Sequence, residues 1–471
     1  MKTKIAFFAI GLFSAIALFG QKANNLSPQE KVYGLSKFWQ EVNYNFVFID
    51  KINRHAWDSL YQDMIAKVLA TPNDYEYYKQ LEFFCAYLND GHTNVYYPND
   101  IAGNIMTTMF GEYRLFLTNI GGKAIVTRVN ESKKDEIPIG SEVISVNGLD
   151  AKTYMKEFVS PYISSSTDYI RDNQSVYHLL RGYKGDKFTI QIKKPNQEVI
   201  TLFLEHQMTE EKGIYPPFEN LNLLEFKKME NGINYLGLNS FDDEKLDSLF
   251  QVILPDLYNS KGLIIDLRNN GGGSTNIGFN VLKHLVSDTM LYGSKSTSRM
   301  HIPAYKAWGT FMTPVDTLQD KPEWGMTKAD VTQSFLMAND AYFYEFPYQP
   351  DPIKGISKRI VAPTVILIGN ATASAAEDFL IYAHGQKHFT LMGEKTFGST
   401  GQPYLFSLPG GGNARVCTKK DTYPNGKEFV GYGITPDIEV KQSLEDYMNN
   451  RDVALERALA YLGQQLQSKK N

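Results

Sequence analysis

The sequence lacks the features that mark several classes of protein. It has only two cysteines in 471 residues, too few for a disulfide framework or for a zinc or iron–sulfur site of four thiolates. Neither sign of charge is in large excess: 48 basic and 52 acidic side chains give a formal net charge of -4, which does not suit a chain-wide nucleic-acid surface. After residue 20 no apolar run is long enough to span a bilayer. What remains is a globular chain long enough for about three domains.

The first twenty residues have the pattern of an export signal. Lys2 and Lys4 precede an apolar run that ends at Phe19, shorter than the roughly 20 residues of a membrane-spanning helix. We therefore interpret residues 1–20 as a cleavable signal peptide, with an uncleaved anchor as the alternative, and predict a periplasmic or extracellular protein. Export would permit a disulfide between Cys85 and Cys417, but two separately buried thiols are an equally good interpretation.

The rest of the chain divides into blocks of different periodicity. Residues 25–100 carry apolar side chains at helical spacing and predict a helical domain. Residues 105–206 are mostly short β runs with one helical stretch at 151–159. Residues 213–445 alternate buried strands with helices and predict an α/β core, interrupted by an aromatic-rich, lid-like insertion without clear period at 294–355. Residues 446–471 predict a closing helix.

Two turns in the predicted core could carry chemistry. In the first, a buried strand at 364–368 leads through small residues to Ser374 at the start of a helix, where a hydroxyl is exposed beside free helical N–H groups. The alternative is an ordinary helix cap, with Glu377 completing a capping box. In the second, the strand at 262–266 leads to three glycines, 271–273, whose backbone N–H groups could hold an oxyanion or a phosphate, or form a plain turn.

Histidine is scarce, so each candidate base can be considered individually. His92 lies in the segment 90–93 (DGHT), where the helical block gives way to an extended one. His384 and His388 have an i, i+4 spacing that could hold a metal, but the glutamate of the zincin helix is absent between them. We therefore expect no metal site.

Taken together, these segments resemble the serine peptidases of the tail-specific, or C-terminal processing, family. Residues 266–273 (DLRNNGGG) are similar to that family's glycine loop, and residues 371–377 (ATASAAE) to its nucleophile turn. The segments 393–398 (GEKTFG) and 433–438 (GITPDI) match two further signatures in the right order. The region 105–206, with IGSEVISVNG at 139–148, resembles the family's PDZ-like domain.

The resemblance implies a fold and a set of roles. The fold would be an α/β core with ClpP/crotonase-like strand–helix layers, an N-terminal helical domain and an inserted β-rich PDZ-like domain. Ser374 would be the nucleophile, with the oxyanion held by backbone groups among Gly272, Gly273 and Ala375. Such chemistry needs no cofactor and no metal.

Departures from the family pattern point to one branch. The Ser–Lys dyad takes its lysine from the position directly after Phe397-Gly398, which here is Ser399, and Lys395 would point elsewhere on an alternating strand. The tricorn-like branch instead uses a histidine ahead of the PDZ-like domain, and this role falls to His92. In that branch a serine precedes the catalytic histidine, and a glutamate near the segment matching 433–438 completes the catalytic residues. In this chain the position before the histidine is Gly91, and the nearest glutamate, Glu428, lies slightly out of register. Ser399 is the alternative for the residue that orients His92.

The resulting prediction is an exported serine endopeptidase that acts on protein or peptide substrates through an acyl-enzyme. Its alternative is a catalytically impaired, peptide-binding pseudoprotease of the same fold. A ligand carrier or esterase is a weaker alternative, since the Gly-x-Ser-x-Gly elbow is absent around Ser374. We expect no nucleic-acid partner and no membrane span after signal cleavage. The sequence gives no oligomeric state.

Overall fold

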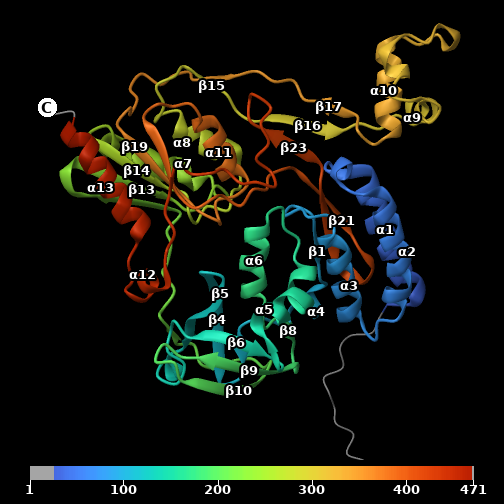
Figure 1. Ribbon diagram of the computed structural model, residues 1–471. Helices are drawn as coiled ribbons and strands as arrows, with labels where there is room; N and C mark the ends of the chain where they lie inside the picture. The colour runs from blue at the N-terminus through green and yellow to red at the C-terminus, as the bar shows by residue number, and fades with distance from the viewer. Residues whose placement is uncertain (1–25, 469–471) are drawn as a thin grey trace, which may run out of the picture.

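The computed structural model describes residues 26–468, so the predicted signal peptide lies outside the described residues. Figure 1 shows three parts: helices at the N-terminal end, a β-rich domain, and an α/β core closed by the C-terminal helix. Within the described residues, no helix is both long and apolar enough to cross a membrane.

The core is a mixed six-stranded sheet in the order β12-β13-β14-β19-β20-β24. The first pair is antiparallel and the other neighbours are parallel. The strands are β12 (Leu224–Lys228), β13 (Ile233–Leu238), β14 (Gly262–Asp266), β19 (Thr364–Ile368), β20 (Phe389–Gly393) and β24 (Ile438–Glu439).

Helices cover both faces of this sheet (Figure 1). On one face lie α7 (Lys245–Leu257), α8 (Thr275–Leu282) and α11 (Ala375–Ala383). The other face packs against α13 (Val453–Ser468), which follows the short α12 (Leu444–Met448). Strands β14 and β19 are buried along their whole length, as expected for central parallel strands with both faces covered.

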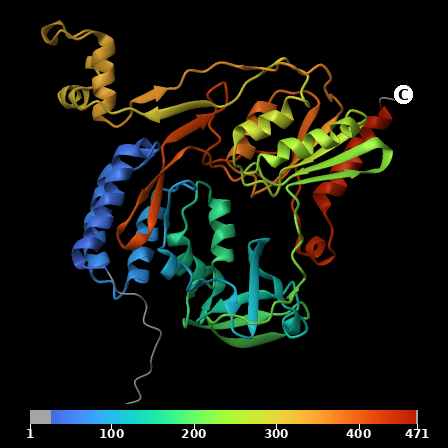
Figure 2. The same cartoon turned by 180° about the vertical axis from the view of Figure 1, so that it is seen from behind.

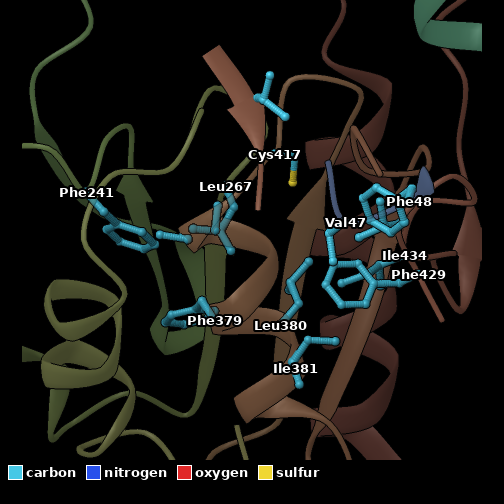
Figure 3. Packing of buried hydrophobic residues seen from close by; sticks show 14 of the residues in the cluster. Val47, Phe48, Phe241, Leu267, Phe379, Leu380, Ile381, Cys417, Phe429 and Ile434 are labelled. Atoms are coloured by element: carbon cyan, nitrogen blue, oxygen red, sulfur yellow. The ribbon is translucent and has the colours of Figure 1, made fainter. Parts of the chain in front are cut away.

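The N-terminal helices share the core's hydrophobic interior. Helices α1 (Pro28–Asn45), α2 (Arg54–Leu69) and α3 (Asp74–Ala86) lead to β1 (Asn94–Tyr96). Strand β1 pairs with β22 (Asn413–Cys417), which in turn pairs with β21 (Pro403–Ser407). Figure 3 shows the joint packing, with Val47 and Phe48 beside Phe429 and Ile434. The described residues 26–100 therefore form no hydrophobic cluster separate from that of the α/β core.

The β-rich domain, by contrast, has a separate core. Its main strands are β4 (Tyr113–Ile120), β5 (Lys123–Asn130), β6 (Glu142–Val146), β9 (Lys187–Lys193) and β10 (Val199–Glu205). The helical stretch expected at 151–159 is present as α5 (Ala151–Tyr154) running into a π-helical turn. A second helix, α6 (Asp168–Tyr177), was not predicted because, of its apolar side chains, only those of Ile170 and Val176 are buried.

The insertion at 294–355, whose sequence shows no clear period, contains regular structure. Strands β16 (Lys295–Arg299) and β17 (Phe343–Glu345) pair, and between them lie α9 (Pro303–Gly309) and α10 (Lys328–Ala338). At its base β16 pairs with β23 (Lys419–Thr422). The two helices project beyond α1, away from the α/β core, in both views (Figures 1 and 2). They are an arm rather than a cover over the sheet.

Candidate active site

Ser374 lies at the carboxyl end of β19, in the turn that begins α11. Its backbone angles, φ 55° and ψ -123°, are those of a left-handed region that L-residues rarely adopt. An ordinary helix cap has an extended backbone instead. Strained backbone of this kind persists where the surrounding structure holds it, and it concentrates at functional sites. The conformation therefore favours a reactive serine over a simple cap.

Glu377 links the Ser374 turn to a second loop. It is fully buried, and its Oε2 accepts the N–H groups of Ser374 (3.3 Å) and Ser399 (3.2 Å). Its Oε1 accepts the Thr396 hydroxyl (2.5 Å) and the Gly398 N–H (2.9 Å). Sequence reasoning treated this residue only as the acid of a capping box. In the structure the Glu377 carboxylate is also the shared hydrogen-bond acceptor that holds the Ser374 turn and the loop at 396–399 together.

The glycine loop lies directly against Ser374. A Cβ added to Gly272 would be 2.7 Å from the Ser374 Cβ and 3.0 Å from the Ala375 nitrogen, so only glycine allows this approach. The Gly272 N–H donates to Asn270 Oδ1 (2.9 Å) and is thus already used. Among the described residues, the N–H groups of Gly273 and Ala375 donate no hydrogen bond. These two are the better candidates for an oxyanion site.

The structure brings His92 and Ser399 together across 307 positions of the sequence. His92 Nδ1 is 2.6 Å from the Ser399 hydroxyl oxygen. The Ser399 carbonyl accepts the Ser374 N–H (3.3 Å), so Ser399 touches both the candidate base and the candidate nucleophile. Because Nδ1 is occupied, Nε2 is the ring nitrogen that remains for proton transfer, as in serine-peptidase triads.

Gly91 is the reason this contact is possible. A Cβ at position 91 would lie 2.7 Å from the Phe397 ring and 3.2 Å from the Ser399 hydroxyl oxygen. Gly91 and Ser399 were noted from the sequence as two separate departures from the family pattern. In the structure they are neighbours, and the Ser399 side chain lies against the glycine.

The turn that carries His92 is fixed from three sides. Asp90 accepts hydrogen bonds from Thr93 Oγ1 (2.6 Å) and Ser166 Oγ (3.3 Å), and Ser166 also accepts the Gly91 N–H (2.9 Å). Thr93 Oγ1 accepts the Cys417 N–H (3.0 Å) from β22. Ser166 belongs to the β-rich domain, so that domain helps to position the histidine.

The electrostatic environment suits a neutral imidazole. Burial lowers the pKa of His92 below its ordinary value, and the nearby Asp90 carboxylate opposes the shift. Burial raises the pKa of Glu377 to about 8, although its four hydrogen-bond donors favour the ionised form. A histidine that is unprotonated at neutral pH can accept a serine proton without prior activation.

The lysines are poorly placed to act as bases. Lys395 is exposed, while its neighbour Thr396 is buried. Lys419 lies near His92, but its amine contacts Asp421 Oδ2 at 3.1 Å. Burial acts to lower the pKa of Lys419, but the carboxylates of Asp421 and Asp378, with a smaller contribution from Cys417, together more than offset burial, so the pKa is raised. An ammonium held in this way cannot accept a proton at neutral pH.

Glu428 does not join the site. Its carboxylate pairs with Lys51 at 3.0 Å and with Lys420, and it forms no polar contact with His92. The expectation that it orients His92 is therefore replaced by the contact of His92 with Ser399. The rival histidines are also engaged elsewhere: His388 Nε2 lies 2.8 Å from the Leu285 carbonyl oxygen, and His384 packs on Tyr423.

Comparisons with known proteins identify the family to which this chain is similar. The sequence profile of peptidase family S41 matches residues 232–440, which contain Ser374, Ser399 and the glycine loop. A carboxyl-terminal-processing protease of a Picosynechococcus species is 22% identical over 462 residues, covering 96% of this chain and 94% of the relative. A carboxy-terminal-processing protease of Bartonella bacilliformis is 32% identical over 234 residues, covering 48% and 43%.

A solved structure supports the fold. Mature CPAF, solved in complex with lactacystin, superposes with a TM-score of 0.62, covering 93% of this chain and 98% of its own. Its sequence is only 14% identical, so the likeness concerns the arrangement of the chain. It extends over the N-terminal helices and the β-rich domain as well as the α/β core.

Proposed function

We propose that this chain, which belongs to peptidase family S41 and is a serine peptidase, is an exported endopeptidase. In this proposal Ser374 is the nucleophile and His92 is the general base. The observation that carries the proposal is the arrangement around Ser399. Its hydroxyl lies against His92 Nδ1, and its carbonyl binds the backbone of the strained Ser374 turn. Residues far apart in the sequence thereby form one constellation.

The chemistry follows the order known for serine acyl transfer. His92 Nε2 takes the proton of Ser374 Oγ as that oxygen attacks the scissile carbonyl carbon. The carbonyl oxygen, now negatively charged, is held by the N–H groups of Gly273 and Ala375. His92 then gives the proton to the leaving amine, and water releases the acyl group by the same steps in reverse.

Ser399 would orient the histidine in place of a carboxylate. In this role its hydroxyl oxygen, 2.6 Å from Nδ1, would accept the Nδ1–H of His92 and so fix the tautomer that leaves Nε2 free. A neutral acceptor stabilises an imidazolium less than a carboxylate does. We therefore expect turnover slower than that of peptidases with a full triad.

The β-rich domain would present the substrate, as a PDZ-like domain does. Helix α6 lies alongside β4, and in PDZ domains an extended peptide adds to the sheet as a further strand. The Asn173 amide in α6 donates to Asn370 Oδ1 (2.8 Å) in the loop after β19, and Tyr169 donates to the Thr396 carbonyl (2.5 Å). A peptide held beside α6 would therefore lie next to the catalytic loops of the crotonase-like core.

Covalent labelling tests the proposal. A fluorophosphonate probe should label the wild-type chain and not Ser374→Ala, which should also fail to cleave a casein-type substrate while keeping its fold. His92→Ala should label at a rate lower by orders of magnitude. A folded wild-type chain that does not label favours the pseudoprotease, for which the neutral Ser399 partner of His92 is the motivating observation.

Export rests on the sequence of residues 1–20, and its test is separate. The mature chain recovered from outside the cytoplasm should begin shortly after Gly20 when its N-terminus is sequenced. A recovered chain that still contains Lys2 would show that the segment is retained.

A further inference from the structure

The projecting arm of α9 and α10 carries an aromatic pocket far from the catalytic loops. The pocket has a volume of about 590 Å³. Four rings line it together with one carboxylate: Tyr305, Trp308, Phe311, Trp324 and Asp330. The arm's own hydrophobic core is small, centred on Met312, Met326 and Val331.

The rings are exposed to a degree that packing of the arm does not explain. Trp308 is 44% exposed, Phe311 73% and Trp324 43%. Two edge-to-face pairs hold them in place, Tyr305 with Trp308 at 5.4 Å and Phe311 with Trp324 at 6.3 Å between ring centroids. Exposed apolar patches of this kind mark interaction sites.

The carboxylate in the wall gives the pocket its chemical preference. Asp330 Oδ2 completes the cap of α10 by accepting from Thr327, and Asp330 Oδ1 lies 3.3 Å from the Tyr305 hydroxyl. Hydrogen bonds from Thr327 lower the pKa of Asp330, so it is ionised at neutral pH. Within the described residues it has no lysine or arginine partner at salt-bridge distance.

Aromatic faces beside a carboxylate attract organic cations. The arm already shows this preference, because Lys321 Nζ lies 5.0 Å from the centroid of the Trp324 ring. Residues 301–340 carry five carboxylates and three lysines, a formal net charge of -2. Asp340 pairs with Arg299 and Asp316 pairs with Lys321, so the charge at Asp330 is the one that lies open to a positively charged partner in the pocket. Exposed Val315 and Leu318 on the same arm offer apolar surface for the chain that flanks such a cation.

We propose that this pocket binds the lysine or arginine side chain of a polypeptide, with the cation between the aromatic rings and the Asp330 carboxylate. The site lies on an arm outside the α/β core, so it acts as a docking point separate from peptide-bond cleavage. Its occupation does not depend on Ser374 or His92.

Tryptophan fluorescence of the full mature chain provides the test, because Trp308 and Trp324 line the pocket. The probe is N-acetyl-arginine amide, and N-acetyl-citrulline amide is its neutral isostere. We expect saturable binding of the arginine compound at least fivefold tighter than that of citrulline. Asp330→Asn should reduce this preference to near one, and Trp308→Ala should abolish binding.

Glu323→Gln is the matched control, since it removes one charge from the same arm but does not line the pocket. It should keep the preference for arginine. Trp308→Phe retains a ring and should keep part of the binding, which separates loss of the site from loss of the arm's fold, as checked by circular dichroism. Equal binding of arginine and citrulline, or equal effects of Asp330→Asn and Glu323→Gln, would overturn the proposal.

Discussion

His92 Nδ1 and the Ser399 hydroxyl oxygen lie 2.6 Å apart, although 307 positions separate them in the sequence. The contact joins the turn between α3 and β1 to the loop after β20. It places a hydroxyl where serine peptidases usually have the group that orients the histidine.

Ser399→Ala should lower kcat by roughly ten- to a hundredfold with little change in KM. Removing one hydrogen bond to a group that becomes charged costs about 1.5–3 kcal/mol, and His92 would lose the partner that fixes its tautomer. Steady-state kinetics on a fluorogenic peptide measures this. Thr400→Val removes the neighbouring hydroxyl, which faces Asp421 instead; if it lowers kcat equally, orientation of His92 is not the cause.

Gly91→Ala should lower both stability and activity. The added methyl group would meet the Phe397 ring and the Ser399 hydroxyl, and overpacking of this kind costs about 1–3 kcal/mol. Urea unfolding gives the free energy of unfolding. Gly103→Ala is the control, because the nearest atom to its added carbon is 3.4 Å away, and it should be close to neutral. A fully active, equally stable Gly91→Ala would show that the site has room at this position.

The two cysteines should behave as inert thiols. Both are free and buried, with Cys85 Sγ 3.3 Å from the Thr93 carbonyl oxygen. Burial raises the pKa of Cys85 to about 12 and that of Cys417 well above its usual range. Titration with a thiol reagent should find no reactive group in the native chain and two after unfolding. A chain that releases its thiols only after reduction would instead contain the disulfide.

Strong local patterns allowed much of the fold to be predicted. Strands β14 and β19 coincide with the predicted segments because their buried apolar runs end in glycine or polar turns. Helix α6 and the helices of the arm were missed. They bury few apolar side chains, so no helical period stands out in the sequence.

The site required the fold because its contacts cross the chain. The sequence marked Ser374, His92 and Ser399 individually, but only the packing of β1 against β22 brings the turn at 90–93 beside the loop at 396–399. Glu377 carried no signal beyond its capping position. Its four donors come from two segments, the Ser374 turn and the loop at 396–399, and no spacing rule predicts such a convergence.

Ser374→Gly should be inactive yet more stable than Ser374→Ala. Glycine adopts φ 55° and ψ -123° without the strain that any side chain introduces, which is worth about 1–3 kcal/mol. Both variants lack the hydroxyl, so the comparison isolates the backbone. Thermal and urea unfolding of the pair would measure the difference. Equal stability would mean that the turn relaxes when the hydroxyl is removed.

The dependence of activity on pH should show two separate rises. As pH increases, His92 must first lose its proton, and because burial lowers its pKa, this limb should have its midpoint below the ordinary value of 6.5. Glu377 has a pKa raised to about 8 and should ionise next. Only the carboxylate form offers both oxygens to all four donors, so its ionisation should tighten the Ser374 and Ser399 turns and raise kcat again.

Glu377→Gln separates the two limbs. Its amide nitrogen cannot accept from the N–H and hydroxyl donors, so kcat should fall at least tenfold and the rise near pH 8 should disappear. The limb below 6.5 should remain, because His92 does not touch Glu377. Glu394→Gln is the matched control: burial also raises the pKa of Glu394, and the charged groups that act on it, Lys441 and Glu439, lie outside both turns. If the rise near pH 8 persists in Glu377→Gln, a group other than Glu377 produces it. If Glu394→Gln removes that rise, the shared acceptor is not the titrating group.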